Sequence, residues 1–403
     1  MAERTTSTFL ELIHRGVLEI GDGYRAKNSE LDGDGLPFMR AGNLTDQGWK
    51  TDGLERFHRH LADKISGKVS RHGDTVITTK GNSTGRTGYV APGMVPFVYS
   101  PHLSFWRTLD PCQIDARYLR YWAIGPEMAD QLASMAHGTD MAPYLSLSDQ
   151  KRLRISLPEI SQQRAIGAIL GALDDKIAVN ERLAAAVDDL AAALFEDLLT
   201  ADAEGTEVLL GDIADVNVRT VKAQDSGSLR YVDISSVGVG SYGWPEEMPW
   251  RDAPGRARRK AAVGDTIWST VRPNRRSHAL VLDEDPDLVF STGLAVLSPK
   301  AVGPAFLYES TRLASFQVYL ESVAEGSAYP AVRADRFKGA PIILPSEDAR
   351  FRFEETVMAM RLRAHQAHVE SRTLAALRDT LLPQLMSGRL RVKDAEKIGE
   401  DQV

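Results

Sequence analysis

Residues 159–200, EISQQRAIGAILGALDDKIAVNERLAAAVDDLAAALFEDLLT, constrain the fold of this chain more than any other stretch. Apolar residues recur there at helical spacing and proline is absent, so the pattern predicts one long helix. At 1.5 Å per residue such a helix is roughly 60 Å long. That length is typical of a spacer or a coiled-coil arm rather than of a helix inside a globular domain.

Heptad spacing sorts the apolar residues of this helix into two seams, which indicates where a second helix packs. Asn180 interrupts one of these seams, and an asparagine in such a place fixes the register of paired helices at some cost in stability. The alternative is that Asn180 faces solvent in a loosely packed region. The seam positions predicted to pair with a partner helix or subunit are Ile166, Leu173, Ile177, Asn180 and Val187.

A second stretch, Ser346 to Leu385, repeats the same pattern 187 residues later, since each stretch follows a Leu-Pro pair and 344 − 157 = 187. Adding this offset to the first seam reproduces the second, so the heptad registers agree. The repeat predicts that the two helices pair antiparallel. The corresponding seam positions are Phe353, Met360, Leu374 and Leu381.

The repeat also extends upstream of both helices. HGDTVITTKGNSTGRTGYV at 72–90 is similar to VGDTIWSTVRPNRRSHALV at 263–281, and the β-branched segments inside them predict equivalent strands. We therefore expect an α+β chain with an internal pseudo-two-fold repeat, in which two globular domains with mixed α/β structure and a twisted sheet are joined by two long antiparallel helices. The expected boundaries are 1–156 and 202–344 for the domains, 157–201 and 345–388 for the helices, and 389–403 for a frayed tail.

Composition narrows the possible environments and functions. The single Cys112 excludes an internal disulfide and a thiolate zinc cluster, and it fits a reducing cytosol. No apolar run is long enough to span a membrane and no signal peptide is evident, so we expect a cytoplasmic location and no membrane partner. The net charge of −7 argues against strong solitary binding to nucleic acid. Basic residues are nevertheless dense between Arg251 and Arg276.

The loops that follow the two equivalent strands are the candidate functional segments. Both combine Arg or Lys with Asn, Ser and Thr, the side chains that contact base edges and phosphates. The alternative is that each is a solvated hairpin loop, but their equivalent places in the repeat favour a shared role. The candidate DNA-binding residues are Lys80, Asn82, Ser83, Thr84 and Arg86 in the first loop, and Thr270, Arg272, Asn274, Arg275 and Arg276 in the second.

For several other segments we expect a structural or solvent-exposed position and no functional role. Tyr144 and Tyr329 are expected in the domain cores rather than at a binding surface. The pair His58 and His60 lacks the spacing of a zinc site and is expected in solvent. A short amphipathic helix is expected over residues 9–18. Phosphate loops, dinucleotide fingerprints, the Asn-Pro-Pro-aromatic motif of amino-methyltransferases and a clustered nuclease motif are all missing from the sequence, so neither catalytic residues nor a metal site are expected.

The helix motifs resemble those of the specificity (S) subunits of Type I DNA restriction–modification systems. The family's Leu-Asp-x-Lys-Ile-x-x-Asn is matched by Leu173, Asp174, Lys176, Ile177 and Asn180. LLPQLMSGRL at 381–390 matches its usual ending, and LLGDIADV at 209–216 is similar to the usual start of its target-recognition domain. The first half lacks an obvious Leu-Gly-Asp-Ile start, and the Leu-Asp-x-Lys-Ile stretch is degenerate in the second helix.

The resemblance implies a non-catalytic subunit that recognises double-stranded DNA. Each globular domain would read one half of a split site, while the long helices would set the unread spacer and dock two methyltransferase (M) subunits. Restriction (R) subunits would join the complex. The chain itself would bind no cofactor, because S-adenosylmethionine, ATP and Mg belong to the partner subunits. Two other functions stay open, a freestanding DNA methyltransferase or nuclease with unrecognised motifs, and a coiled-coil scaffold that binds only protein.

Overall fold

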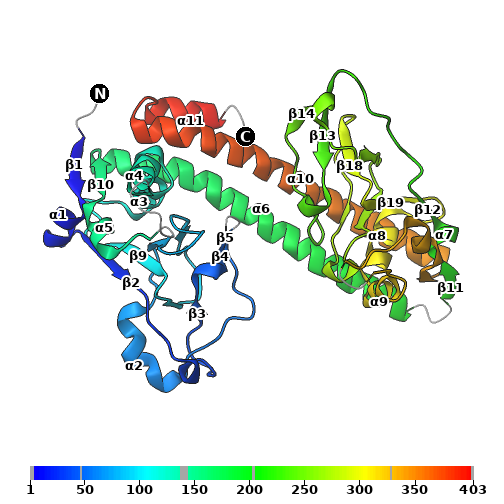
Figure 1. Cartoon of the computed structure of the whole chain (residues 1–403), viewed down its shortest axis with the longest axis horizontal. Helices are drawn as coiled ribbons and strands as arrows, with labels where there is room; N and C mark the ends of the chain where they lie inside the picture. Colours follow the sequence, from blue (N-terminus) through cyan, green and yellow to red (C-terminus); the bar gives the residue numbers. More distant parts are fainter. Residues whose placement is uncertain (1–3, 46–47, 137–143, 202–204, 327–328, 401–403) are drawn as a thin grey trace. The chain divides into compact units, whose positions relative to one another are not determined.

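The computed structural model describes residues 4–45, 48–136, 144–201, 205–326 and 329–400. It divides into two compact units, the first comprising Met1–Ile177 with Arg372–Val403 and the second Ala178–Ser371. Both long helices are continuous across this division, α6 over Ile160–Ala201 and α10 over Glu347–Ser387 (Figure 1). The α+β class, the long helices and the internal repeat are therefore confirmed. The division between the units crosses both helices, so each long helix contributes one part to the first unit and the other part to the second.

The first unit is built on a four-stranded sheet in the order β2-β9-β6-β7, with the small pairs β1-β10, β3-β8 and β4-β5 around it. Among the named strands in the described part of this unit, β3 and β8 form the parallel pair. The helices α3 and α4 follow the sheet in the chain and precede α5. The strands are β1 (Thr5–Thr8), β2 (Leu18–Asp22), β3 (Phe38–Met39), β4 (Leu44–Thr45), β5 (Gly48–Trp49), β6 (Thr75–Thr78), β7 (Thr87–Tyr89), β8 (Val98–Tyr99), β9 (Leu103–Thr108) and β10 (Arg154–Leu157); the helices are α1 (Phe9–His14), α2 (Ala62–Ile65), α3 (Ala116–Ala123), α4 (Pro126–Ala136) and α5 (Leu147–Arg152).

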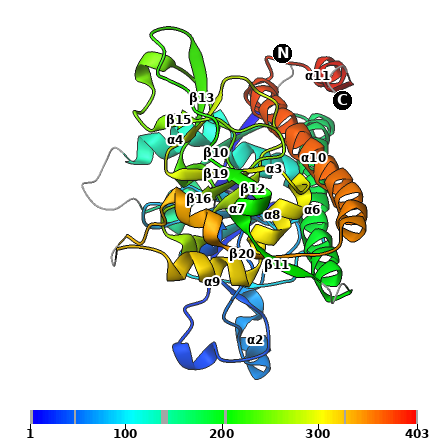
Figure 2. The same ribbon diagram turned by 90° about the vertical axis from the view of Figure 1, so that its right-hand side faces the viewer.

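The second unit repeats this topology, with the corresponding sheet in the order β12-β19-β16-β17. Three strands of this sheet, β12, β16 and β19, are labelled in Figure 2. A second sheet, β14-β13-β18-β15, contains the parallel pair β13-β18. The strands are β11 (Thr206–Leu209), β12 (Ala214–Val216), β13 (Ser228–Val232), β14 (Glu247–Pro249), β15 (Ala257–Arg259), β16 (Thr266–Ser269), β17 (His278–Leu280), β18 (Leu288–Ser291), β19 (Leu294–Pro299) and β20 (Pro341–Leu344); the helices are α7 (Leu210–Ile213), α8 (Pro304–Arg312) and α9 (Ala314–Ser322).

The two units begin in the same way, although their sequences differ. In the first, the Thr8 amide donates to Glu11 Oε2 over 2.7 Å. In the second, the Leu209 amide donates to Asp212 Oδ2 over 3.0 Å. A carboxylate three residues into the helix satisfies an amide that would otherwise lack a partner. The Leu-Gly-Asp-Ile start that the first half lacks in sequence is thus replaced there by an equivalent turn built on Glu11.

A buried aspartate precedes the central strand of each sheet. Asp74 and Asp265 follow glycines with φ of 91° and 92°, and their carboxylates accept from the amides three residues earlier, Arg71 and Ala262. Each also binds an arginine, Arg107 in the first unit and Arg219 in the second, at 2.7 Å. A Gly-Asp turn therefore starts each strand, and the ion pairs keep the buried carboxylates satisfied.

Asn180 is buried at the interface of α6 and α10, where its side-chain amide donates to the Ala367 carbonyl over 3.2 Å and to Glu370 Oε2 over 2.8 Å. The alternative of a solvent-facing Asn180 is thus wrong. In the second unit Phe195 packs on Phe353 with ring centroids 5.3 Å apart. In the first unit Arg378 binds Asp174 over 2.8 Å. Because residue numbers rise along α6 as they fall along α10, the helices pair antiparallel.

Most of the predicted seam residues are buried, several of them in the hydrophobic cores of the two units. Ile166, Leu173, Leu374 and Leu381 belong to the core of the first unit, and Phe353 to that of the second. Val187 is buried as well, whereas Ile177 and Met360 are half-buried.

Two expectations, about where the first helix ends and about the segment after the second long helix, are wrong. The helix expected over residues 9–18 ends at His14, because Gly16 takes a φ of 69° and the chain turns into β2. The segment after the second long helix is not a frayed tail. It forms α11 (Val392–Glu400), in which Ala395 is buried in the core of the first unit. Pro383 also lies inside α10, which ends at Ser387 before Gly388 adopts a φ of 73°.

His278 is buried in the second unit, stacked on Trp268 with ring centroids 4.8 Å apart. Its Nδ1 donates to the Arg276 carbonyl over 2.6 Å. Burial lowers the pKa of this imidazole from 6.5 to about 4. The unfolded chain therefore binds a proton that the folded unit excludes, so stability falls as pH drops from about 6.5 towards 4.

We expect this titration to cost the second unit up to about 3 kcal/mol of unfolding free energy at pH 4 relative to pH 7. The His278→Asn variant retains a donor but no titrating ring, so the pH dependence of its stability should be shallower by that amount. Urea denaturation at both pH values measures the difference. Equal slopes for both proteins would contradict the assignment.

Candidate nucleic-acid interface

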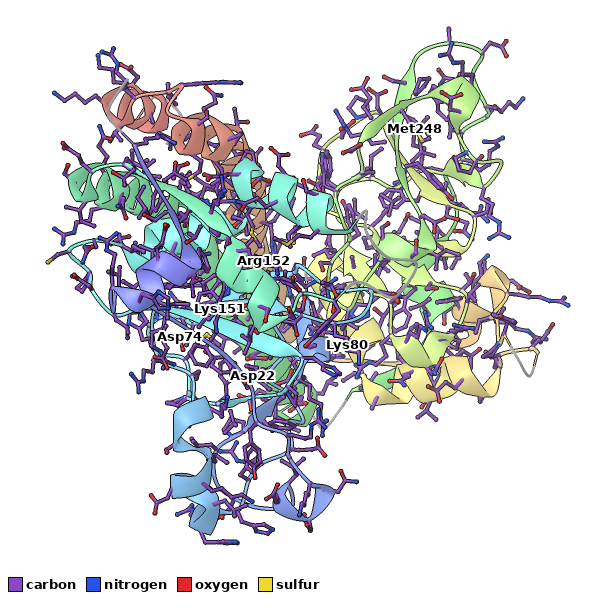
Figure 3. All side chains as sticks on the ribbon, turned by 60° about the vertical axis from the view of Figure 1, so that its left-hand side comes forward. Asp22, Asp74, Lys80, Lys151, Arg152 and Met248 are labelled. Atoms are coloured by element: carbon purple, nitrogen blue, oxygen red, sulfur yellow. The ribbon has the colours of Figure 1, made fainter. Side chains whose placement is uncertain are left out.

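The first predicted loop connects β6 to β7 and is held by its own backbone. Thr84 Oγ1 donates to the Gly81 carbonyl over 2.7 Å, and the Arg86 amide donates to the Ser83 carbonyl over 2.9 Å. Lys80 and Asn82 are exposed, whereas Ser83, Thr84 and Arg86 are half-buried. Lys80 lies at the end of β6 opposite to Asp74 (Figure 3). The exposed Lys80 and Asn82 are therefore the members of this loop best placed to contact DNA.

Arg86 also contacts its own unit. Its Nη1 donates to the Leu44 carbonyl over 3.1 Å, which ties the loop to the β4-β5 hairpin. Thr79, at the other end of the loop, donates its amide to the His102 carbonyl over 2.9 Å. These two contacts bring the loops after β3, β6 and β8 together on one side of the first unit.

A cavity of about 400 Å³ lies between the segments that follow β2, β3 and β8. Its polar lining includes three basic side chains, Arg25, Arg40 and His102, all of which are exposed. Sequence reasoning missed these residues because they are dispersed over 78 positions, 102 − 25 + 1. The available signal was the LPFMR segment, since Arg40 follows the strand that it contains.

The second predicted loop connects β16 to β17 and exposes Asn274 and Arg275. Arg272 takes a left-handed φ of 53° and lies over the Tyr329 ring, with its guanidinium carbon 4.7 Å from the centroid. Such stacking holds the guanidinium plane in place while its donors stay available. Arg272, Asn274 and Arg275 therefore form the accessible part of this loop.

Two of the predicted residues in the second loop bind carbonyls of their own unit. Arg276 Nη2 donates to the Arg312 carbonyl over 2.6 Å, at the end of α8. Thr270 Oγ1 donates to the Gly293 carbonyl over 2.9 Å. Both contacts hold the loop in position. Within the wider basic span from Arg251 to Arg276, Lys260 also binds its own unit, since its Nζ donates to the Leu288 carbonyl.

An exposed tyrosine lies beside each loop. Tyr144 forms a β-bridge with Lys80 and is 64% exposed, and Tyr329 is 69% exposed beneath Arg272. The expectation that both rings lie in the cores is wrong, because the segments that carry them pair with the loops instead of entering the sheets. An exposed aromatic ring next to a basic side chain provides a stacking surface suited to nucleic acid. Residues 137–143, which precede Tyr144, lie outside the described residues.

Two further exposed basic residues, Lys151 and Arg152, end the short helix α5 (Figure 3). This helix follows Leu145, whose amide donates to the Thr79 carbonyl over 2.9 Å. The first unit therefore adds positive charge from a third segment to the neighbourhood of its loop. Such local charge supplies phosphate affinity despite the net charge of the chain.

We expect Arg275→Ala to weaken specific DNA binding by about 1–3 kcal/mol, because the substitution removes an exposed arginine side chain from the loop. Among the described residues, the substitution breaks no side-chain hydrogen bond or ion pair. Arg86→Ala is expected to weaken binding as well, but through loosening of the contact with Leu44. Fluorescence anisotropy with target DNA measures both losses, and hydrogen exchange of the 44–49 hairpin separates them. Unchanged binding by Arg275→Ala would show that this loop does not contact DNA.

The described part of the chain shows neither a cluster of metal-ligand side chains nor a membrane-spanning helix. It contains no group of three or more His, Cys, Asp or Glu side chains placed to hold a metal ion. His58 and His60 stack on each other with centroids 5.5 Å apart. None of the helices in these segments has the length and apolar character needed to cross a membrane.

Residues 15–188 match the family model described as the Type I restriction modification DNA specificity domain. No match is found among curated protein sequences. The crystal structure of a Type-I restriction-modification system S subunit from M. genitalium superposes with a TM-score of 0.60 at 16% identity, covering 95% of this chain and 96% of that one. This likeness shows a shared fold along nearly the whole chain.

Two other solved structures align at lower scores. One is the HsdS subunit from Thermoanaerobacter tengcongensis, with 15% identity, a TM-score of 0.37 and coverage of 96% and 97%. The other comes from work on complex assembly and conformational transition of the type I R-M system, with 16% identity, a TM-score of 0.36 and coverage of 97% and 100%.

Proposed function

We propose that this chain is a specificity subunit of a Type I restriction–modification system and that each of its units reads one half of a bipartite DNA site. The match of residues 15–188 to the specificity-domain family model supports the first part of the proposal. The observation that carries the proposal is the repeated interface. At equivalent places of two units with the same sheet topology, a polar loop exposes basic and amide side chains beside an exposed tyrosine. Two such surfaces on one chain suit two short sequences separated by an unread spacer.

The accessible side chains have the chemistry of major-groove recognition. Arginine pairs with guanine O6 and N7, and asparagine with adenine N6 and N7. Lys80, Asn82, Asn274 and Arg275 are the exposed members of the two loops. The Arg272 guanidinium lies over the Tyr329 ring. In this proposal these five residues contact DNA, whereas Arg86, Thr270 and Arg276 position the loops and Ser83 and Thr84 close the first turn.

We further propose that this chain performs no chemistry itself. Two methyltransferase subunits would dock on it and supply S-adenosylmethionine, and restriction subunits would supply ATP- and Mg-dependent cleavage. The net charge of −7 supports this dependence on partners, because a net acidic chain gains little from phosphate contacts alone. The paired helices α6 and α10 would set the spacer, and the complex would act in the cytoplasm.

Methylation mapping tests this function directly. Genomic DNA is sequenced from cells that express the methyltransferase subunits with or without the full chain. We expect methylation of a split, asymmetric motif only when the chain is present. The purified chain should neither methylate nor cut DNA unaided, and unaided activity would instead identify a freestanding enzyme. Complexes that methylate without sequence preference would indicate a protein-binding scaffold.

A further inference from the structure

The residues after the parallel strands β3 and β13 occupy the same place in the two units. Asn43 donates its amide to the Arg40 carbonyl over 2.9 Å, and Ser236 donates to the Asp233 carbonyl over 3.2 Å. Each donation closes a short 3-10 turn directly after the strand. Arg40 and Asp233 are therefore equivalent positions with opposite charge.

The neighbouring loop is equivalent as well. Thr79 donates to the His102 carbonyl, and Thr270 donates to the Gly293 carbonyl, in both cases over 2.9 Å. Where the first unit has the imidazole of His102 beside this position, the second has a glycine. The carboxyl ends of two parallel strands meet at one edge of a sheet, so Arg40 lies beside the segment that carries His102, and Asp233 beside the segment that carries Gly293. Through Thr79 and Thr270, each of these segments contacts the loop of its unit that we propose binds DNA. The two units thus present different chemistry from one shared scaffold.

Arg40 is held in one orientation in the first unit. Its Nε donates to Glu55 Oε2 over 2.9 Å, and its Nη2 contacts the same oxygen. The guanidinium carbon lies 4.9 Å from the centroid of the Phe38 ring. Within the described residues Nη1 has no hydrogen-bond partner, and Arg40 lines the 400 Å³ cavity with Arg25 and His102. A guanidinium fixed on one edge presents its remaining donors without further ordering.

Asp233 is held as an acceptor in the second unit. The Ser235 amide donates to its Oδ1 over 3.0 Å, and the Tyr231 hydroxyl donates to its Oδ2 over 3.1 Å. The Ser235 amide, followed by the hydroxyls of Ser235 and Tyr231, lowers the pKa of this half-buried carboxyl, so it is ionised at neutral pH. A carboxylate has up to four lone-pair sites and therefore retains acceptor capacity after these contacts.

We infer that Arg40 and Asp233 each select the base pair at one position of their half-site. Arg40 selects guanine, whose O6 and N7 accept from a guanidinium, whereas Asp233 selects cytosine, whose N4 amino group donates to a carboxylate. The inference rests on the proposed function, since it assigns specificity within the interface that reads DNA. It explains why one scaffold used twice recognises two different sequences.

The test uses the full chain expressed with its methyltransferase subunits and reads base preference from sequenced methylated DNA. Arg40→Ala should reduce the preference for guanine about 5- to 150-fold at one position of one half-site. Asp233→Asn, which retains an acceptor for the Ser235 amide, should shift preference towards adenine at one position of the other half-site. Arg59→Ala is the matched control, because Arg59 is an exposed arginine of the same unit paired with Asp34.

The outcomes separate the inference from the proposed function. Failure of the wild-type complex to methylate a specific motif would overturn the function. With specificity intact in the wild type, a uniform loss of affinity in Arg40→Ala and a salt slope reduced by about one would reveal a phosphate contact and overturn base selection. Changes by both variants within the same half-site would also overturn it. The control should leave every position of the motif unchanged.

Discussion

Replacement of Arg361 by methionine is expected to lower the unfolding free energy of the second unit by about 3–5 kcal/mol. Arg361 extends from α10 to Asp188 of α6, with Nη1 at 2.7 Å from Oδ1, and to the buried Glu309 of α8. Arg312 completes the cluster by binding Glu309 over 2.8 Å and also contacting Asp188. Two arginines and two carboxylates balance, so removal of one arginine leaves a buried negative charge without compensation.

The side-chain exposures decide the magnitude. Glu309 is 2% exposed and Arg361 10%, so water cannot replace the lost partner. Burial raises the pKa of Asp188, but the hydrogen bonds and charges of Arg361 and Arg312 outweigh burial and lower it overall. The cluster thus joins the domain helix α8 to both long helices through ion pairs. A loss this large is specific to buried pairs, because exposed ion pairs contribute at most about 1 kcal/mol.

Native-state hydrogen exchange of α8 and the adjacent part of α10 measures this loss. Arg363→Met is the matched control, since Arg363 lies two residues along the same helix with an exposed side chain. The double variant Arg361→Met with Glu309→Gln should recover part of the loss because it also removes the buried charge. Equal protection in Arg361→Met and the control would refute the role of the cluster.

A four-residue insertion in the middle of α6 is expected to change the spacer of the methylated motif or to abolish methylation. Four residues add about 6 Å and rotate the following helix by about 40° beyond a full turn. The insertion displaces one half of α6 against α10, where Asn180 binds Ala367 and Glu370. A buried polar contact in one register resists such a shift.

The informative comparison is a matched insertion of four residues in both α6 and α10, at levels that face each other. This variant preserves the pairing on both sides of the insertion, and we expect it to restore methylation with a spacer longer by roughly two base pairs, at about 3.4 Å per pair. Sequencing of methylated DNA gives the spacer directly. An unchanged spacer in the matched variant would count against the helices as the ruler.

The surface loops show where sequence reasoning succeeded and where it could not. Repetition identified both loops, because equivalent segments of a duplicated chain fold alike. It could not separate Arg275, which is exposed, from Arg276, which donates to a carbonyl of α8. Adjacent residues of one type have the same local propensity, so their roles depend on which neighbours the fold supplies. Tyr144 and Tyr329 illustrate the same limit, since an aromatic ring in a loop is compatible with core or surface.

The sequence by itself determined the long helices, their register and the internal repeat, because heptad spacing and a constant offset are properties of residue order. It also located Asn180 on a seam. Only the tertiary structure decided that Arg25, Arg40 and His102 share a cavity and that Arg40 and Asp233 are equivalent. These relations join segments far apart in the chain through hydrogen bonds between loops. Local sequence patterns do not specify such contacts, because only the packed sheet brings the loops together.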